Sequence, residues 1–365
     1  MKCNRCLNKN VFLFEKIYCE NCIDCYYCLK CAHISIFKIC NHTLDNLTFT
    51  NETIDYKLKY KLTINQLKLS QSVINNIKNR NIFINATCGA GKTEILFEVI
   101  KQYVNFNKKV CFVTPRIEVT HELYHRFNRA FRCNFGIITG NKKVYTGPLF
   151  FMTCNQLVNY HNIFDLVIVD EADAFPLAND QILNNGIQNS LSNDGRVIKM
   201  SATPLKIDKN YLTLELFERY HKQKIPEPIF IKTSLHLLKE KILNKSWIVF
   251  FPTIRNLEEI YSEMKNESII ICHSKITRNI EKHNLTNETF VIFSTAILER
   301  GVTFANVNVI VYNSDHKNYL TSTLIQISGR VGRVIPYTNG EVLFMANTKT
   351  VTILRAIKYI QSLND

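Results

Sequence analysis

The stretch Asn81–Glu94, NIFINATCGAGKTE, begins with a short apolar run and continues into a loop that contains Gly89 and Gly91. An amphipathic segment follows the loop. A strand, a glycine loop and a helix in this order place backbone N–H groups and a helix N-terminus where they can bind phosphate groups. The stretch therefore predicts an α/β domain in which one strand leads into a phosphate-binding loop.

The side chains of this loop indicate a nucleotide as the ligand. Lys92 is expected to reach the β- and γ-phosphates, and the Thr93 hydroxyl is expected to hold Mg²⁺. The residues predicted to contact ATP are consecutive: Gly89, Ala90, Gly91, Lys92, Thr93 and Glu94. Ala86 occupies the position of the first glycine in the common Walker pattern of phosphate-binding loops. The alternative is a glycine-rich turn that occurs by chance. The order of strand, loop and helix disfavours this alternative.

The segment VIVDEAD, residues 167–173, supplies acidic groups at the end of a second apolar strand. Asp170 is expected to hold Mg²⁺ through its water shell, and Glu171 to polarise the attacking water. Phosphoryl transfer needs this kind of positioning more than covalent chemistry. The alternative is an acidic pair that caps the next helix.

Short apolar runs alternate with longer amphipathic stretches from about Leu62 to Thr203, which predicts a parallel sheet with helices on both faces. A second series of this kind follows KIPEPIF, residues 224–230, where Pro226 and Pro228 predict an extended linker. The strands are expected at 81–86, 109–114, 149–153, 164–170, 196–202, 246–251, 268–273, 290–295, 307–313 and 340–346.

These patterns divide the 365 residues into five parts, because the chain is too long for one ordinary core. The prediction is a cysteine-rich module at 1–45, a linker at 46–61, an ATP-binding domain at 62–205, a second linker at 206–228, and a second α/β domain at 229–365. The polar stretch 41–61 is expected to form a linker or edge structure.

The net charge of +14 favours a polyanion such as nucleic acid or an anionic membrane as partner. A solvated, lysine-rich surface is the alternative. We find no apolar stretch near 18 residues, which predicts no transmembrane helix. The start MKCNRC has no apolar signal-peptide core behind it, so a cytosolic location with reduced thiols is expected.

The segment QISGRVGR, residues 326–333, contains Gln326, Arg330 and Arg333 at spacings of four and three. This spacing predicts one face of a helix. Arginines there could act as fingers on the γ-phosphate of a nucleotide held by the other domain. A solvated surface is the ordinary alternative for such arginines.

Thirteen cysteines divide sharply along the chain. Five are scattered and are expected to be small buried apolar residues: Cys88, Cys111, Cys133, Cys154 and Cys272. Eight lie in the first 40 residues: Cys3, Cys6, Cys19, Cys22, Cys25, Cys28, Cys31 and Cys40. Reduced Cys-x-x-Cys pairs favour a structural zinc site with four ligands over a redox device or disulfides.

Cys3 and Cys6 supply one pair of zinc ligands. The regular spacing of the later cysteines leaves the second pair open among four choices: Cys19/Cys22, Cys22/Cys25, Cys25/Cys28 and Cys28/Cys31.

Six segments occur in a characteristic order: TCGAGKT (87–93), TPR (114–116), DEAD (170–173), SAT (201–203), ERGVTF (299–304) and QISGRVGR (326–333). Their order resembles that of superfamily 2 helicases and translocases. The resemblance implies two tandem RecA-like parallel-sheet P-loop domains. It also implies that Gln66 reads adenine, that Gly301 contacts the nucleotide, and that Ser201 and Thr203 couple hydrolysis to movement. The residues that it implies for nucleic-acid contact are Thr114, Arg116, Thr153 and Thr295.

A narrower resemblance is to the competence protein ComFA family, in the segments CGAGKTE, DEADAFP, ILERGVT and QISGRVGR and in the early CNRC with a later YCLKC. It implies a translocase for single-stranded DNA that powers uptake of transforming DNA at the inner face of the cell membrane. The implied partners are the DNA-uptake channel and other late-competence proteins. For zinc, the resemblance favours Cys28 and Cys31. Cys19 and Cys22 then remain for a second ion, with Cys25, Cys40, His33 or His42.

Two other hypotheses stay open. One is a primosomal, repair or RNA helicase with the same ATPase engine. The other is a zinc-anchored nucleic-acid scaffold with an inactive motor, which the intact residues Lys92, Asp170 and Glu171 disfavour.

Overall fold

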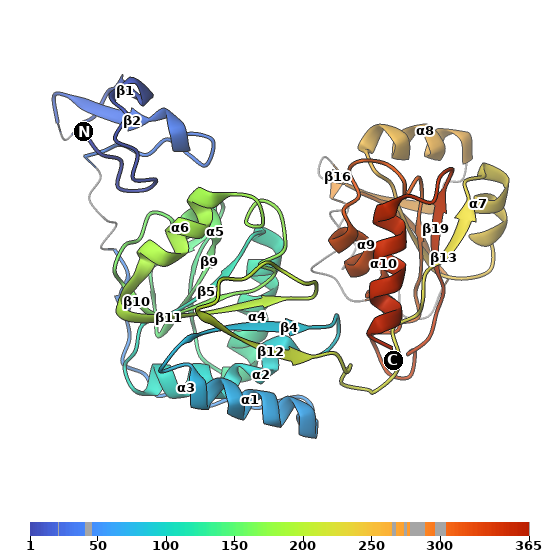
Figure 1. Ribbon diagram of the computed structural model, residues 1–365, viewed down its shortest axis with the longest axis horizontal. Helices are drawn as coiled ribbons and strands as arrows, with labels where there is room; N and C mark the ends of the chain where they lie inside the picture. Colours follow the sequence, from blue (N-terminus) through green and yellow to red (C-terminus); the bar gives the residue numbers. More distant parts are fainter. Residues whose placement is uncertain are drawn as a thin grey trace. The chain divides into compact units, whose positions relative to one another are not determined.

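The computed structural model describes residues 1–20, 22–40, 46–264, 268–273, 276–277, 289–295 and 304–364 (Figure 1). Contacts within the chain define two units. The first comprises Met1–Asn85 and Lys92–Leu216, and the second comprises Ala86–Gly91 and Phe217–Asp365. The loop Ala86–Gly91 therefore groups with the second unit, although it connects two elements of the first.

The first unit contains a sheet with the strand order β12-β4-β11-β10-β5-β9-β6-β7. The strands are β4 (Asn81–Ala86), β5 (Val110–Thr114), β6 (Gly136–Ile138), β7 (Lys143–Val144), β9 (Leu149–Thr153), β10 (Phe164–Val169), β11 (Leu191–Ser201) and β12 (Tyr211–Leu216). The pairs from β4 to β6 are parallel, whereas β7 pairs with β6 in the antiparallel sense. This confirms the parallel sheet predicted from the sequence.

Helices cover both faces of this sheet (Figure 1). They are α1 (Ile64–Asn76), α2 (Lys92–Ile95), α3 (Phe97–Asn105), α4 (Ile117–Phe131), α5 (Cys154–Leu157) and α6 (Gln181–Ser190). Alternate residues of β5 face opposite sides, as the period of two requires. Cys111 packs in one core cluster with Leu157 of α5, whereas the Phe112 ring lies 5.5 Å from that of Phe127 on α4.

The second unit contains a sheet with the strand order β13-β19-β18-β14-β17-β15-β16. Its strands are β13 (Ile229–Lys232), β14 (Trp247–Phe250), β15 (Ile269–His273), β16 (Ile276–Thr277), β17 (Val291–Ser294), β18 (Asn308–Val311) and β19 (Val342–Ala346). All pairs are parallel except β15 with β16. The five strands predicted here are present, and β13 and β16 are additional.

The helices of the second unit are α7 (Leu235–Lys241), α8 (Ile254–Met264), α9 (Thr321–Ser328) and α10 (Val351–Ser362). Two core clusters lie on opposite faces of its sheet. Phe250 belongs to the cluster that includes residues of α9 and α10, and its neighbour Val249 to the cluster that includes Leu238 and Leu257 of α7 and α8. None of the described helices is long and apolar enough to cross a membrane.

The N-terminal module precedes the first sheet and is built around a hairpin. It contains η1 (Val11–Leu13), β1 (Phe14–Ile17), β2 (Cys25–Cys28) and η2 (Leu29–Cys31), with β1 and β2 antiparallel. Farther on, β3 (Thr48–Phe49) pairs with β8 (Thr146–Gly147). The stretch predicted as linker or edge structure thus contributes a two-residue edge strand.

Candidate nucleotide site and cysteine clusters

The glycine loop after β4 has the backbone conformation that phosphate binding needs. Gly89 and Gly91 have φ values of 84° and 73°, which favour glycine. The Ala90 N–H donates to the carbonyl of Thr87 over 3.2 Å and so closes a turn. Because α2 begins at Lys92, the loop leads directly into a helix N-terminus. Residues 87–93 therefore fit a bound nucleotide phosphate.

The acidic pair lies at the carboxyl end of β10. The Asp170 N–H donates to the Val113 carbonyl of β5 over 2.9 Å, and an Asp170 carboxylate oxygen accepts from the Glu171 N–H over 2.8 Å. Glu171 has a φ of 53°, an unusual conformation for a residue with a side chain, which costs about 1 kcal/mol or more. Such strain concentrates at functional sites.

The helix-capping alternative for this pair is wrong. The next helix, α6, starts at Gln181, and Asp180 caps it by accepting from the N–H groups of Ile182 and Leu183. The Mg²⁺ and water-activating roles of Asp170 and Glu171 stay predictions. A hard cation with oxygen ligands suits a site made of the Thr93 hydroxyl and the Asp170 carboxylate.

The SAT segment begins at Ser201, the last residue of β11, in the same unit. Ser201 donates to the carbonyl of Thr203 over 2.6 Å and accepts from its N–H over 3.0 Å. The Thr203 hydroxyl donates to a carboxylate oxygen of Asp173 over 2.9 Å. The structure therefore joins the SAT turn directly to the DEAD segment, and the coupling role of Ser201 and Thr203 stays a prediction.

Gln66 and Glu94, two residues predicted to contact the nucleotide, make local contacts within the first unit. The Gln66 side-chain oxygen accepts from the Thr63 N–H over 2.8 Å and completes a capping box at the start of α1. Glu94 pairs with Arg126 of α4. Their nucleotide contacts stay predictions.

Three of the residues predicted to touch nucleic acid follow or end parallel strands: Thr114 ends β5, Thr153 ends β9, and Thr295 follows β17. Thr114 is fully buried, and its hydroxyl bonds with the Thr120 hydroxyl over 2.6 Å and donates to the Arg116 carbonyl over 3.0 Å. Through the second bond, Thr114 holds the backbone at Arg116. Arg116 itself is half-buried. Thr153 is buried and Thr295 is half-buried. Nucleic-acid contact by the four residues stays a prediction.

The helical prediction for the QISGRVGR segment is wrong in part. α9 ends at Ser328, so Gln326 lies in the helix, Arg330 lies in the turn after it, and Arg333 follows that turn. The C-cap of α9 is Gly329, and Gly332 in the following turn has a φ of 67°, which favours glycine. Gln326 and Arg330 are buried, whereas Arg333 is half-buried and donates to the Gly329 carbonyl over 2.8 Å.

Gly301, also predicted to contact the nucleotide, lies outside the described residues.

Arg219 is a residue of the second unit that sequence reasoning missed. Arg219 is 2% exposed, and its guanidinium donates to the carbonyls of Cys88, Gly329, Val331 and Gly332 at 2.9–3.2 Å. Burial lowers the pKa of Arg219 to about 10, and the nearby positive charge of Arg333 adds to this effect. One buried side chain thus holds the glycine loop and the QISGRVGR turn within this unit. Arg219 lies in the segment predicted as a linker, where no motif marked it.

Four cysteines of the N-terminal module converge into a buried group: Cys3, Cys6, Cys28 and Cys31. Their sulfur atoms lie within 4.8 Å of one another, with Cys3 and Cys31 at 3.7 Å and Cys6 and Cys28 at 3.5 Å. The hydrogen bond with Cys31 lowers the pKa of Cys3 to about 5. Four thiols at this spacing fit the tetrahedral sulfur site that zinc prefers.

The other zinc candidates lie elsewhere. Cys19 and Cys22 form a second group with Cys25 and Cys40. His33 bonds with Asp180 over 3.0 Å instead of joining either group. His42 lies outside the described residues.

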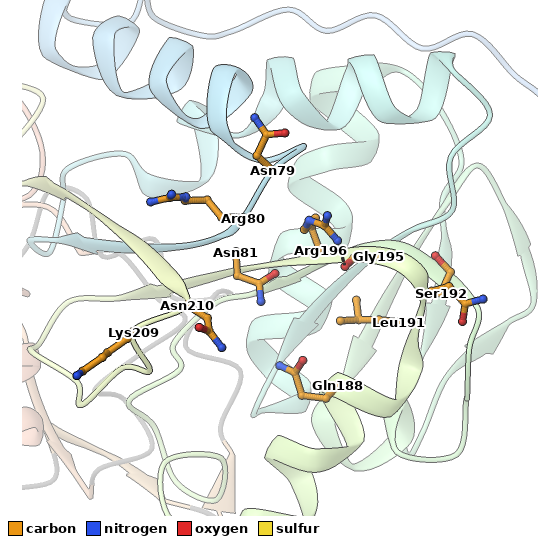
Figure 2. A pocket seen from close by; sticks show the side chains of 11 residues that line it. Asn79, Arg80, Asn81, Gln188, Leu191, Ser192, Gly195, Arg196, Lys209 and Asn210 are labelled. Atoms are coloured by element: carbon orange, nitrogen blue, oxygen red, sulfur yellow. Dashed lines mark hydrogen bonds between the residues drawn. The ribbon is translucent and has the colours of Figure 1, made fainter.

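A pocket of about 640 Å³ lies at the amino-terminal ends of β4 and β11 in the first unit (Figure 2). Its lining includes Asn81, the first residue of β4, whereas the glycine loop follows the last residue of that strand. Arg80, Arg196 and Lys209 make this lining basic. Among the residues that the structure describes, none of those predicted for nucleotide or nucleic-acid binding lines this pocket.

Comparisons with known families and structures agree with this architecture. Residues 59–206 match the family described as type III restriction enzyme, res subunit, and residues 231–335 match the helicase conserved C-terminal domain.

Two solved structures share the fold. Mycobacterium smegmatis helicase Lhr, bound to single-stranded DNA and AMP-PNP, has a TM-score of 0.63 at 15% identity over 82% of this chain and 48% of its own. Saccharomyces cerevisiae Dbp5, bound to RNA and ADP BeF₃, has a TM-score of 0.61 at 18% identity over 83% of this chain and 88% of its own. The class is therefore that of ATP-hydrolysing superfamily 2 helicases and translocases, with two RecA-like domains.

Two relatives that match nearly the whole chain identify the family within this class. Competence protein ComFA of Streptococcus pneumoniae is 32% identical over 99% of this chain and 90% of its own, and that of Bacillus subtilis is 29% identical over 100% and 86%. The chain belongs to the competence protein ComFA family.

Proposed function

We propose that the chain is a translocase for single-stranded DNA that powers the uptake of transforming DNA across the cell membrane during competence. The observation behind this proposal is the 32% identity to Streptococcus pneumoniae ComFA over 99% of the chain. The glycine loop and the acidic pair of the ATPase are both intact, which disfavours the scaffold with an inactive motor.

The proposal gives each of the chain's motif residues a role. The loop N–H groups and Lys92 would bind the ATP phosphates, and Glu171 would orient the attacking water. Thr93 and Asp170 would hold Mg²⁺, which neutralises phosphate charge when bound. Arg330 and Arg333 would stabilise the charge that develops on the γ-phosphate. Such arginines contribute about 10³–10⁵ in rate in related phosphoryl transfer.

The proposed track is a single DNA strand gripped through its phosphate backbone. Arg116 is the charged member of the predicted contact set, and Thr114 holds the backbone at that position. Contacts to phosphate carry no sequence information, which suits incoming DNA of any sequence. A net charge of +14 favours such binding and predicts that it weakens as salt rises.

The cellular setting is part of the same proposal. The protein would act in the cytoplasm at the inner face of the membrane, beside the DNA-uptake channel and other late-competence proteins. A zinc ion on Cys3, Cys6, Cys28 and Cys31 would stabilise the N-terminal module, whose small core is composed largely of these cysteines.

ATP turnover with different polynucleotides tests the proposal. We expect single-stranded DNA to stimulate hydrolysis more than duplex DNA or RNA. Lys92→Ala should reduce turnover by about 10²-fold or more, because it removes a positive charge aimed at the phosphates. Lys68→Ala, which removes an exposed lysine of α1, is the matched control and should hydrolyse ATP normally.

Stimulation by RNA above single-stranded DNA would favour the RNA-helicase alternative, for which the fold shared with Dbp5 is the motivation. Gene deletion in the native host separates uptake from repair. Loss of DNA internalisation with retained DNA binding at the surface supports the uptake role, and normal internalisation contradicts it.

A further inference from the structure

The second cysteine group of the N-terminal module has the geometry of a metal site of its own. The sulfur atoms of Cys19, Cys22, Cys25 and Cys40 all lie within 4.8 Å of one another. Cys40 is 3.4 Å from Cys19 and 3.0 Å from Cys25, sulfur to sulfur. We propose that these four cysteines bind a second zinc ion, separate from the site of Cys3, Cys6, Cys28 and Cys31.

The sulfur spacing matches tetrahedral zinc. Four sulfurs at about 2.3 Å from one ion lie about 3.8 Å from each other. The separations of Cys40 from Cys19 and Cys25, 3.4 and 3.0 Å, are somewhat shorter than this value, and all four sulfur atoms lie within 4.8 Å of one another. Four thiolates around one point are a closed set, so the ion would be structural and would have no open position for water or substrate.

Strand β2 explains why the cysteines divide in this way. Cys25 and Cys28 are its first and last residues, three positions apart. Successive side chains of a strand point to opposite faces, so residues at an odd spacing lie on different faces. Cys25 therefore faces the second group and Cys28 the first. The pair Cys25/Cys28 cannot serve one metal ion while β2 remains a strand.

The fourth ligand reaches the site through backbone pairing. Tyr27 of β2 forms an antiparallel bridge with Lys38, and the Ile39 N–H donates to the Tyr26 carbonyl over 2.8 Å. This pairing carries the chain along β2 and places Cys40 beside Cys25. No such placement follows from sequence spacing, because Cys40 is not part of a Cys-x-x-Cys pair.

Disulfide bonds do not account for the group. A disulfide joins two sulfurs at about 2.05 Å, whereas Cys40 lies close to both Cys19 and Cys25 and can bond covalently with only one. None of these four cysteines is in a disulfide bond in the structure. Convergence of four thiols, instead of two pairs, is the arrangement that a soft metal ion selects.

The two sites alternate along the chain and share one hairpin. The order is Cys3 and Cys6, then Cys19, Cys22 and Cys25, then Cys28 and Cys31, and finally Cys40. Each ion would therefore connect parts of the chain that lie on both sides of the other ion's ligands in the sequence. Binding energy at either site stabilises β1 and β2, so the two ions should support each other's retention.

Metal content of the full-length protein, purified under reducing conditions, tests the proposal. Elemental analysis should find two zinc ions per chain in the wild type and about one in Cys40→Ser. Cys133→Ser is the matched control, since Cys133 is a half-buried cysteine outside the module, and it should retain two. Cobalt substitution gives a second measurement, because thiolate-to-cobalt absorption should fall about twofold in Cys40→Ser.

Replacing one cysteine ligand by histidine tests the site even if Cys40→Ser unfolds the module. Cys40→His should retain two ions, because zinc accepts imidazole, with a cobalt spectrum altered for one of them. Loss of both ions in Cys40→Ser with recovery in Cys40→His also supports the site. One zinc ion per chain in the wild type, two in Cys40→Ser, or iron in place of zinc would overturn the proposal. None of these measurements depends on ATP hydrolysis or DNA uptake.

Discussion

The Thr203 hydroxyl donates a hydrogen bond to the Asp173 carboxylate over 2.9 Å, and both side chains are buried in the first unit. Asp173 is the last residue of the DEAD segment, and Thr203 is the last residue of the SAT segment. The bond connects the loop after β10 with the turn after β11. Movement of either segment therefore disturbs a contact that the other shares.

Thr203→Val tests this connection. The change keeps the branched shape but removes the donor to Asp173, which leaves a buried acceptor without that bond at a cost of about 1–3 kcal/mol. We expect the number of nucleotides translocated per ATP hydrolysed to fall severalfold. Translocation and ATP turnover should be followed in one reaction. Thr203→Ser retains the hydroxyl and should keep the wild-type ratio; an equal ratio in Thr203→Val would exclude the coupling role.

Arg5 should hold the N-terminal module against the first sheet domain. Arg5 is 1% exposed, and its guanidinium donates to the Ser35 carbonyl over 2.7 Å and to the Asn159 side chain beyond α5. Arg5→Ala should weaken this attachment by about 1.5–3 kcal/mol, the range for bonds that involve a charged group. Limited proteolysis should then cut residues 46–61 faster.

Lys2→Ala is the control for the Arg5 prediction, since it removes an exposed positive charge of the same module. It should be cut at the wild-type rate. If Arg5→Ala were also cut at that rate, the contact with Asn159 would have no part in holding the module.

Gly136→Ala should destabilise the first sheet by about 1–3 kcal/mol, the usual cost of overpacking. A Cβ atom at Gly136 would lie 2.3 Å from the ring of Phe150, which is fully buried in β9. Gly140→Ala is the matched control, because its Cβ would meet only Ile117 at an ordinary 3.5 Å. Urea unfolding measures both. Equal midpoints for the two variants would show that the sheet absorbs the added methyl group without strain.

Much of the fold follows from local sequence. Asn81–Ala86 and Leu149–Thr153 are strands with the bounds that were predicted, because each is a short apolar run that a parallel sheet buries on both faces. The glycine loop could also be predicted from the sequence, because its positive φ values favour glycine at positions 89 and 91. Asp170 was placed correctly at the end of a strand because the apolar run stops there.

Other features depended on contacts between distant segments. The spacing of Gln326, Arg330 and Arg333 suggested a continuous helix, but α9 ends at Ser328, and Arg219 donates to the carbonyls of the turn that follows. Satisfied carbonyls allow that turn to be buried. Local spacing contains no information about a partner more than a hundred residues away.

The N-terminal cysteines show what the sequence determines and what only the tertiary structure determines. The sequence by itself determined that eight cysteines lie within 40 residues and that their pairs favour zinc. It left the choice of ligands open, because equal spacing makes every neighbouring pair equivalent. Only the tertiary structure decided the grouping: β2 turns Cys25 and Cys28 to opposite faces, and pairing along that strand brings Cys40 to Cys25. The physical reason is that a strand assigns side chains to faces by position, whereas a sequence interval fixes only their distance along the chain.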